Sequence, residues 1–337
     1  MSIQKTVIRY AGGKSRAIKQ ITPFVEPYDV IVSPFLGGGS MEVHWASLGK
    51  KVIGADTFGL LINFWDQVLH NPDELADELS KISPTKEVFN IVKELMMCCP
   101  ETQDMLSDWK TDFYKREKVL LPKVKLAAYY YFNHNTSYGP GFLGWASDIY
   151  MNESKWEKTI EKIRQFSCTN LSVTHGSFED TISQNPEEFL YLDPPYYTEK
   201  DGDNKMLCGI YPMKNIPVHH SSFDHELLRD TLLSHKGDFV LSYNNCETIR
   251  EYYSDFEFAF PKWHYSLDIG ETRVGKNRKD RKTSVELDEV DALTAEIGRL
   301  ETQSIKNKKR IASLVHQRHE IMKKESHEIL IIKRTEK

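Results

Sequence analysis

Short apolar runs rich in β-branched residues alternate with helical patterns along much of this 337-residue chain, and this alternation constrains the fold most. The strand-like runs are residues 30–32, 51–55, 171–174, 189–192 and 239–242, and the clearest helical patterns between them are residues 154–166 and 223–235. Parallel strands need long crossover connections, which are usually helices. The alternation therefore predicts an α/β domain with a mainly parallel sheet.

Residues 71–152 interrupt the alternation. They contain helical stretches at residues 71–80, 85–97 and 123–133 and no convincing strand. This pattern indicates a helical domain inserted into the sheet domain.

A coiled-coil-like periodicity lies near the C-terminus. The apolar residues on its heptad register are Val290, Leu293, Ile297, Leu300, Ile311, Leu314 and Ile321. A straight helix over residues 284–325 would be about 60 Å long and would carry the chain away from the sheet. Yet residues 329–333 have a strand pattern, which we expect to pair with residues 263–267. We therefore predict a helical hairpin within residues 285–325 that turns near residues 302–309; a dimeric coiled coil of continuous helices is the alternative.

The net charge of −5 means that a nucleic-acid-binding surface would need locally concentrated positive charge. Two basic runs, residues 273–282 and residues 306–310, provide it. In the first run we predict phosphate contacts for Arg278, Lys279 and Arg281, with a solvated face as the alternative.

Several kinds of segment are not indicated. No run approaches the about 20 apolar residues of a membrane helix, and residues 1–20 lack the apolar block of a secretory signal. We therefore expect a cytoplasmic protein with no membrane partner. The five cysteines form no CxxC pair, which favours free thiols. His219 and His220 lack further ligands at metal-binding spacing, so no metal is expected.

Four motifs follow one another where an α/β sheet would bring them to one edge. They are Tyr10-Ala11-Gly12-Gly13-Lys14, the loop Pro34-Phe35-Leu36-Gly37-Gly38-Gly39-Ser40 after the first strand, Asp56 after the second, and Asp193-Pro194-Pro195-Tyr196 after residues 189–192. A glycine loop lets a ligand approach the backbone, and an acid after the second strand can bind ribose hydroxyls. Helix packing and helix capping are the alternative roles of the loop and of Asp56.

The Asp-Pro-Pro-Tyr motif has a specific chemical use. Two prolines have fixed φ angles, and they stiffen the backbone just beyond a buried strand. The Asp193 carboxylate and the Pro194 carbonyl can then accept hydrogen bonds from an exocyclic amino group and stabilise the positive charge that develops there during alkylation. Tyr196 offers a face on which an extruded base can stack.

In the order of these motifs, the chain resembles the D12 class of DNA adenine methyltransferases, the family of the Dam enzymes, over residues 7–253 and the terminal strand. The resemblance implies transfer of a methyl group from S-adenosylmethionine to adenine N6 in duplex DNA. It also implies the Rossmann-like mixed sheet of a class I methyltransferase, formed by residues 1–70, 153–284 and 326–337. Residues 71–152 would be the target-recognition domain, and the hairpin at residues 285–325 has no counterpart in the short Dam enzymes.

The resemblance also implies roles for individual residues. The cofactor would contact Tyr10, Lys14, Asp56 and Asp193, in a pocket lined by Phe35, Gly37 and Gly39. The catalytic residues would be Asp193, Pro194, Pro195 and Tyr196. In the segment rich in Asn, Tyr and Gly, the residues expected to contact DNA are Asn133, Asn135 and Tyr138, whereas residues 129–132 are expected to pack a helix core. Residues 242–245 would lie beside the target base.

Ser33 is a departure, because many family members have Glu before the Pro-Phe of the loop. Methylation of another amino group, such as cytosine N4, adenine in RNA or a protein glutamine, stays an alternative, as does a DNA-binding relative that has lost catalysis. A restriction endonuclease is a candidate functional partner, and a monomer or weak dimer is expected.

Overall fold

The structure is a computed structural model that describes residues 4–105, 118–138, 141–197, 223–261, 289, 291–297, 310, 313–314, 317 and 328–334. The chain divides into two compact units. Met1–Phe260 together with Glu328–Lys337 form the first, and Pro261–His327 form the second.

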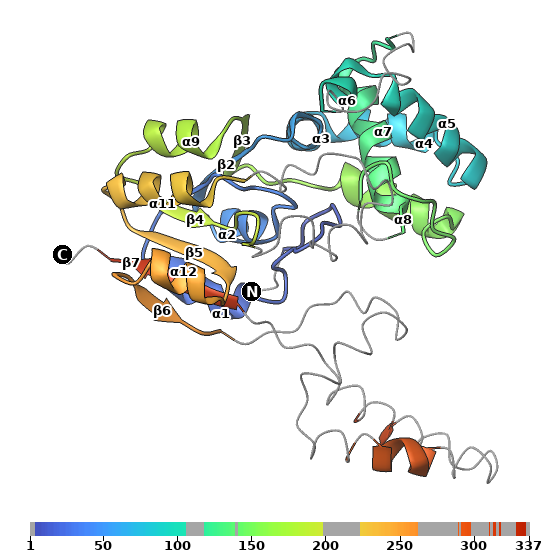
Figure 1. The fold of residues 1–337 in the computed structure, drawn as a ribbon. Coiled ribbons are helices and arrows are strands. Elements are labelled where there is room, and N and C mark those ends of the chain that lie inside the picture. The colour runs from blue at the N-terminus through green and yellow to red at the C-terminus, as the bar shows by residue number, and fades with distance from the viewer. Residues whose placement is uncertain are drawn as a thin grey trace. The chain divides into compact units, whose positions relative to one another are not determined.

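A seven-stranded sheet forms the centre of the first unit, with strand order β3-β2-β1-β4-β5-β7-β6 (Figure 1). The strands are β1 (Val30–Ser33), β2 (Lys51–Asp56), β3 (Leu171–His175), β4 (Phe189–Leu192), β5 (Phe239–Asn244), β6 (Glu257–Ala259) and β7 (Glu328–Lys333). The first five strands pair in parallel, whereas β7 runs antiparallel between β5 and β6. The predicted α/β fold is confirmed, and this mixed sheet is consistent with a class I methyltransferase.

One strand prediction was wrong. We expected the terminal strand to pair with residues 263–267. On the side of β7 that faces away from β5, the paired strand is instead β6, where Phe258 lies opposite Ile331. The three residues of β6 are too short a run for alternation of apolar and polar residues to be recognised. Residues 263–267 lie outside the described residues.

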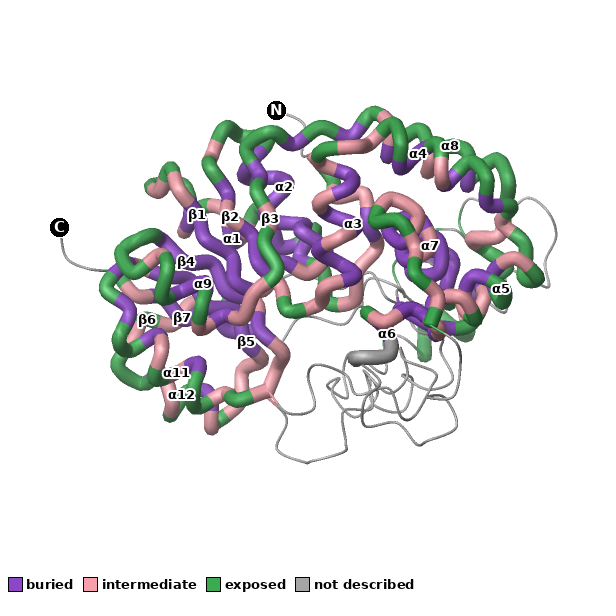
Figure 2. Tube along the Cα trace, turned by 90° about the horizontal axis from the view of Figure 1, so that it is seen from above, coloured by how far each residue is buried: buried purple, intermediate pink, exposed green. Residues whose placement is uncertain are grey.

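Helices cover both faces of the sheet. On one face, α9 (Phe178–Gln184), α11 (His225–Ser234) and α12 (Glu247–Tyr252) pack against apolar strand residues such as Leu190, Leu241 and Ile331. On the other, Trp45 of α2 (Ser40–Ser47) makes an edge contact with Tyr191 of β4. The Trp45 indole also donates to Thr22 Oγ1 of α1 (Ile18–Val25), so α1 is held against α2. The buried residues follow the strands in Figure 2.

The described residues of the segment between β2 and β3 are largely helical, and the inserted domain at residues 71–152 stays a prediction. Residues 71–152 contain α4 (Pro72–Ser80), α5 (Lys86–Met97), α6 (Pro100–Met105) and α7 (Lys123–Thr136), and they lie beside α3 (Gly59–His70) and α8 (Glu153–Arg164) (Figure 1). The packing prediction for residues 129–132 is confirmed for Tyr130, Tyr131 and Phe132, which are buried. Because α3, α4 and α5 all pack on α7, these aromatic side chains form the core of the helical block.

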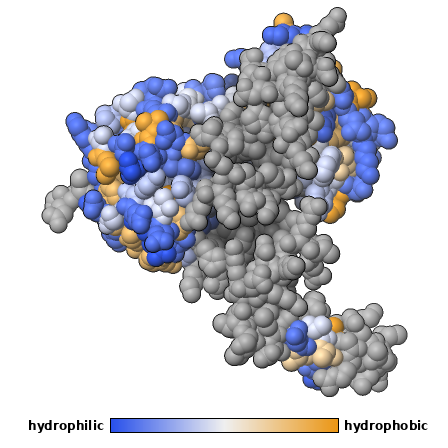
Figure 3. All heavy atoms as spheres, in the orientation of Figure 1, coloured by the Kyte–Doolittle hydropathy of each residue, from blue (hydrophilic) through white to orange (hydrophobic). Residues whose placement is uncertain are grey.

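The described surface is mainly hydrophilic on the face drawn in Figure 3, with apolar residues scattered among polar ones. Within the described residues, no helix combines the length and apolar character needed to cross a bilayer.

In the second unit, described residues are few, but two of them form an ion pair. Arg310 Nη2 lies 2.6 Å from Glu296 Oε1, and the nearby Ile297 and Leu314 are buried. Fourteen residues of straight helix would separate the two charged residues by about 21 Å. The ion pair therefore favours the hairpin over a continuous helix. Residues 298–309 lie outside the described part of the chain, so the hairpin stays a prediction.

Candidate active site at the carboxyl edge of the sheet

The glycine loop leaves β1 at the carboxyl edge of the sheet. Gly37 and Gly39 have φ angles of 48° and 60°, a left-handed conformation that favours glycine. A Cβ atom on Gly39 would lie 2.7 Å from the Trp65 ring, and one on Gly38 would clash with the Cβ of Tyr10. The glycines therefore let two aromatic side chains lie directly on the loop. This is a use beyond the close ligand approach that the sequence suggested.

Asp56 fixes the loop from the end of β2. Its Oδ2 accepts a hydrogen bond from the Gly37 amide at 2.9 Å, and its Oδ1 accepts one from the Phe58 amide at the same distance. Each carboxylate oxygen has a second lone pair, so the group can still accept ribose hydroxyls. The loop also carries Phe35, whose ring packs against Phe178 and Phe223.

Lys14 and Asp193 form a buried ion pair at the same edge. Lys14 Nζ lies 2.8 Å from Asp193 Oδ1, and the Lys14 side chain is 4% exposed whereas that of Asp193 is 22% exposed. The ammonium also lies 4.9 Å from the centroid of the Tyr196 ring. The structure thus brings the first motif against the fourth, although 179 residues separate Lys14 from Asp193.

A third charged group joins this pair from the far end of the chain. Glu328, the first residue of β7, places Oε2 3.6 Å from Lys14 Nζ. The same oxygen accepts a hydrogen bond from Ser242 Oγ at 3.2 Å, and Ser242 Oγ lies 3.3 Å from the Tyr196 hydroxyl. We call Lys14, Asp193, Glu328, Ser242 and Tyr196 the carboxylate cluster. Ser242 therefore lies next to Tyr196, and the position of residues 242–245 beside the target base stays a prediction.

Burial sets the electrostatics of this cluster. Desolvation raises the pKa of Asp193, and the Lys14 ammonium opposes that rise. Desolvation lowers the pKa of Lys14, but its two carboxylate neighbours outweigh this effect, so the pKa of Lys14 is raised overall. The pKa of Glu328 is raised by desolvation, again opposed by Lys14. Lys14 therefore carries its charge at neutral pH, held by two carboxylates.

Behind the loop lies another buried acid that the sequence did not point to. Glu42 of α2 accepts a hydrogen bond from Ser33 Oγ at 2.7 Å. Desolvation raises the pKa of Glu42 to about 7, and the Asp193 charge adds to that rise. Ser33, the position that departs from the family pattern, is thus the hydroxyl partner of a buried carboxyl group.

The polar end of α7 binds the N-terminal segment rather than facing solvent. Asn135 Oδ1 accepts from the Arg9 amide at 3.0 Å, and His134 Nε2 lies 2.7 Å from the Arg9 carbonyl. The Tyr131 hydroxyl donates to the Val7 carbonyl, and Asn133 Oδ1 accepts from the amide of Leu143. Asn133, His134 and Asn135, with Tyr131, are called the α7 cluster below. Because the His134 ring also stacks on Tyr10, this cluster sets the position of Tyr10 over the glycine loop.

The residues predicted to contact DNA are thus placed differently from one another. Asn133 is 0% and Asn135 7% exposed, with their amides directed into the protein, whereas Tyr138 is 58% exposed. The nearby Trp145 is also exposed, and its carbonyl accepts from the Tyr138 amide at 2.7 Å. Arg278, Lys279 and Arg281 lie outside the described residues, as does the segment 198–222 with His219 and His220.

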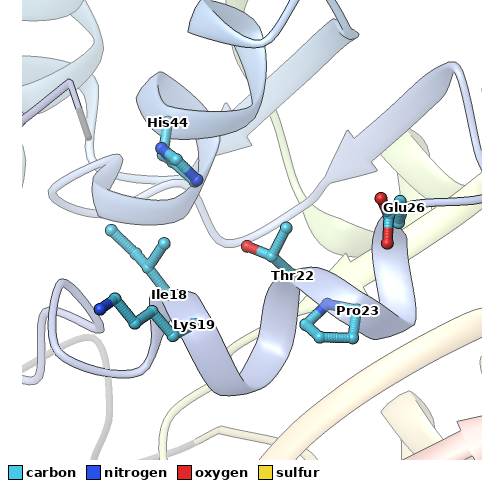
Figure 4. A pocket seen from close by; sticks show the side chains of 6 residues that line it. All are labelled: Ile18, Lys19, Thr22, Pro23, Glu26 and His44. Carbon is cyan, nitrogen blue, oxygen red and sulfur yellow. The ribbon is translucent and has the colours of Figure 1, made fainter. Parts of the chain in front are cut away.

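A surface pocket between α1 and α2 involves none of these side chains. It is lined by Ile18, Lys19, Thr22, Pro23, Glu26 and His44 (Figure 4). None of these residues belongs to a motif of the sheet edge, and we assign the pocket no role in the chemistry.

The residues at the sheet edge suit S-adenosylmethionine, the cofactor that the resemblance implies. Asp56 can accept hydrogen bonds from its ribose hydroxyls, and the buried Glu328 and Glu42 with the half-buried Asp193 favour a ligand that carries positive charge. Within the described residues, no three His, Cys, Asp or Glu side chains gather as metal ligands would.

Comparison with known proteins agrees with this chemistry. No curated protein gives a significant match. However, residues 10–267 match the family described as D12 class N6 adenine-specific DNA methyltransferase. That match includes the glycine loop, Asp56 and the Asp193–Tyr196 motif and covers well over half of the chain. The chain therefore belongs to the D12 class of N6 adenine-specific DNA methyltransferases, a family that uses S-adenosylmethionine to methylate adenine N6 in DNA.

Proposed function

We propose that this protein methylates adenine N6 within a specific sequence of duplex DNA, after the target adenine has rotated out of the helix. The observation that carries the proposal is the buried contact between Lys14 and Asp193 directly beside the Tyr196 ring. It joins the N-terminal motif, the acceptor carboxylate and an aromatic face at one edge of the sheet. Duplex bases are stacked, so chemistry on an amino group at that edge requires an extruded base.

The chain's own groups provide orientation and charge. When bound, S-adenosylmethionine supplies a methyl group on a positively charged sulfur. Asp193 and the Pro194 carbonyl accept hydrogen bonds from the two N6 protons, which makes the nitrogen lone pair available and stabilises its developing positive charge. The stiffness of Pro194-Pro195 keeps both acceptors in place. Lys14 orients the Asp193 carboxylate, and Tyr196 stacks on the base.

We assign DNA contacts to two further regions. The exposed Tyr138 and Trp145 follow α7 and offer aromatic surface near the helical block. The basic run with Arg278, Lys279 and Arg281 would bind phosphates. Replacing all three with Ala should reduce the slope of log K against log salt by about 0.9 per lost contact. An unchanged slope would show that the run is only a solvated face.

The buried amides of Asn133 and Asn135 support a different use. We propose that they contribute to DNA recognition indirectly, because they position the N-terminal segment and the loop that carries Tyr138. Residues 71–152 would act as the target-recognition domain and residues 285–325 as a helical hairpin. We further propose that the protein acts in restriction–modification or DNA protection. We propose that it is a monomer or a weak dimer.

One experiment identifies the modified atom. Purified protein is incubated with unmethylated duplex DNA and cofactor labelled on its methyl group, and the DNA is digested to nucleosides. We expect label in N6-methyladenine. Label in N4-methylcytosine, or transfer to RNA alone, would replace the proposal with one of its alternatives. Absence of label in every substrate would favour a relative that has lost catalysis.

A further inference from the structure

The least expected member of the carboxylate cluster is Glu328. Its side chain is 3% exposed, and it lies 135 residues beyond Asp193 in the sequence. It reaches the site because β7 runs antiparallel to β5, so that Glu328 is opposite Asn244 at the carboxyl edge. A carboxylate is costly to bury unless it has partners.

Glu328 shares the Lys14 ammonium with Asp193. The distances are 3.6 Å from Lys14 Nζ to Glu328 Oε2 and 2.8 Å to Asp193 Oδ1. Without Glu328, Lys14 and Asp193 would form a neutral pair. With it, the three groups carry a net charge of −1 when both carboxylates are ionised. The N6 nitrogen of the target adenine then lies beside side chains whose net charge is negative rather than zero. This holds although Asp193, which accepts its hydrogen bond, is paired with the Lys14 ammonium.

Glu328 also ends the hydrogen-bonded chain that holds Tyr196. Ser242 Oγ donates to Glu328 Oε2 at 3.2 Å and lies 3.3 Å from the Tyr196 hydroxyl. Among the described residues, no side chain or backbone group forms a hydrogen bond with the other carboxylate oxygen, the buried Glu328 Oε1. An unsatisfied buried acceptor is costly in a structural role alone, whereas it adds negative potential to an active site.

We propose that Glu328 is a positioning residue for methyl transfer: it balances the Lys14 charge, so that Asp193 faces the target amino group within a cluster of net negative charge, and it anchors the Tyr196 ring through Ser242. The inference rests on the proposed function, because it assigns Glu328 to the same amino-group chemistry. It acts through Lys14, Asp193 and Tyr196, and not by contact with the base.

The test compares single-turnover methylation of duplex DNA by the wild-type protein, Glu328→Gln and Glu328→Asp. Gln keeps the size and the acceptor of Glu but removes the charge, and we expect its methyl-transfer rate to fall by about 10- to 100-fold. Asp keeps the charge, so its rate should be closer to that of the wild type. The affinity for S-adenosylhomocysteine, measured by calorimetry, should change by less than about 3-fold in either variant, because Glu328 is assigned no contact with the cofactor.

The matched control is Glu257→Gln, which removes an exposed carboxylate from the neighbouring strand β6 and should leave the rate unchanged. A Glu328→Gln rate equal to that of the wild type would overturn the inference. So would equal losses in the Glu328→Gln and Glu328→Asp variants, since these would indicate packing rather than charge. If Glu328→Gln does not fold, the Asp variant decides: a rate below that of the wild type by more than about 100-fold would contradict a role of charge. If the wild-type protein modifies no adenine, the proposed function itself fails.

Discussion

The carboxylate cluster and the α7 cluster both bury polar side chains, yet they do so in opposite ways. In the carboxylate cluster, one ammonium is shared by two carboxylates. In the α7 cluster the side chains are neutral and bind the backbone of the N-terminal segment. Burial lowers the pKa of His134 to about 4, so the ring is uncharged at neutral pH. Nε2 must then carry the proton, because a carbonyl oxygen only accepts.

This difference separates a site that acts on charge from one that fixes backbone geometry. Stability that depends on the carboxylate cluster should vary with pH, because its groups titrate. Within the α7 cluster, the contributions of the uncharged Asn133 and Asn135 should not vary with pH, whereas His134 should lower stability as pH falls below about 6.5, because burial lowers its pKa from 6.5 to about 4. Two substitutions test the contrast, and a third tests the buried acid Glu42 behind the glycine loop.

The largest effect is expected for Lys14→Met. This change leaves Asp193 and Glu328 buried without their shared cation, which should lower the free energy of unfolding by about 3–5 kcal/mol at pH 8. The folded-state pKa of both carboxylates is already raised, and the loss of Lys14 raises it further. Acids with a raised folded-state pKa lose stability as pH rises, so the deficit should be smaller at pH 5.

Urea unfolding at the two pH values measures this deficit. Lys50→Met is the control, because Lys50 Nζ donates only to the carbonyls of Glu26 and Tyr28. Its effect should be the same at both pH values. A Lys14→Met deficit that does not change with pH would contradict the charged state of the cluster.

A second effect is expected for Glu42→Gln, which keeps an acceptor for Ser33 Oγ. The pKa of Glu42 rises from 4.5 to about 7 on folding, so wild-type stability should fall as pH increases through this interval. The Gln variant lacks that loss and should be more stable than the wild type at pH 8, by up to about 3 kcal/mol. Melting curves at pH 5 and pH 8 measure it, and the same difference at both pH values would refute the raised pKa.

The smallest effect on stability is expected for Asn135→Ala in the α7 cluster. The buried amide of Arg9 would lose its acceptor, at a cost of about 1–3 kcal/mol that is equal at pH 5.5 and pH 8. Affinity for S-adenosylhomocysteine should also fall, because the Arg9–Tyr10 segment is released. In the control, Asn152→Ala, an N-cap of α8 is lost, which should cost about 1 kcal/mol and leave the affinity unchanged. If Asn135→Ala and Asn152→Ala bind S-adenosylhomocysteine with equal affinity, the α7 cluster does not support the cofactor site.

The two clusters also differ in how far the sequence predicted them. The ends of the predicted strands placed Asp56 and Asp193 at one edge of the sheet, because the carboxyl ends of parallel strands lie at the same edge. Glu328 was missed, since its role depends on β7 entering antiparallel between β5 and β6. A signal did exist: a strand that reverses beside β5 must begin where β5 ends, so an acid at its first residue lies at the same edge. The Glu42–Ser33 contact could not be predicted, because it depends on the direction in which α2 runs from the loop. The spacing of residues in the sequence carries no information about that direction.

For α7 the prediction stopped too early along the chain. The expected helix ended at residue 133, whereas α7 continues to Thr136. Asn and His residues at the end of a helix resemble a polar loop, which made solvent exposure and direct DNA contact the natural expectation. The backbone of Arg9, which His134 and Asn135 bind, lies more than 120 residues away in sequence, and the local pattern carries no information about it.

The most direct test of the central claim is single-turnover methylation of unmethylated duplex DNA by the wild-type protein and Asp193→Ala, with the modified base identified and folding checked by melting. The account predicts N6-methyladenine from the wild-type protein and a rate at least about 100-fold lower for the folded variant, because the variant lacks the acceptor that stabilises charge on N6. A near-normal rate for Asp193→Ala, or wild-type product on a base other than adenine, would contradict it.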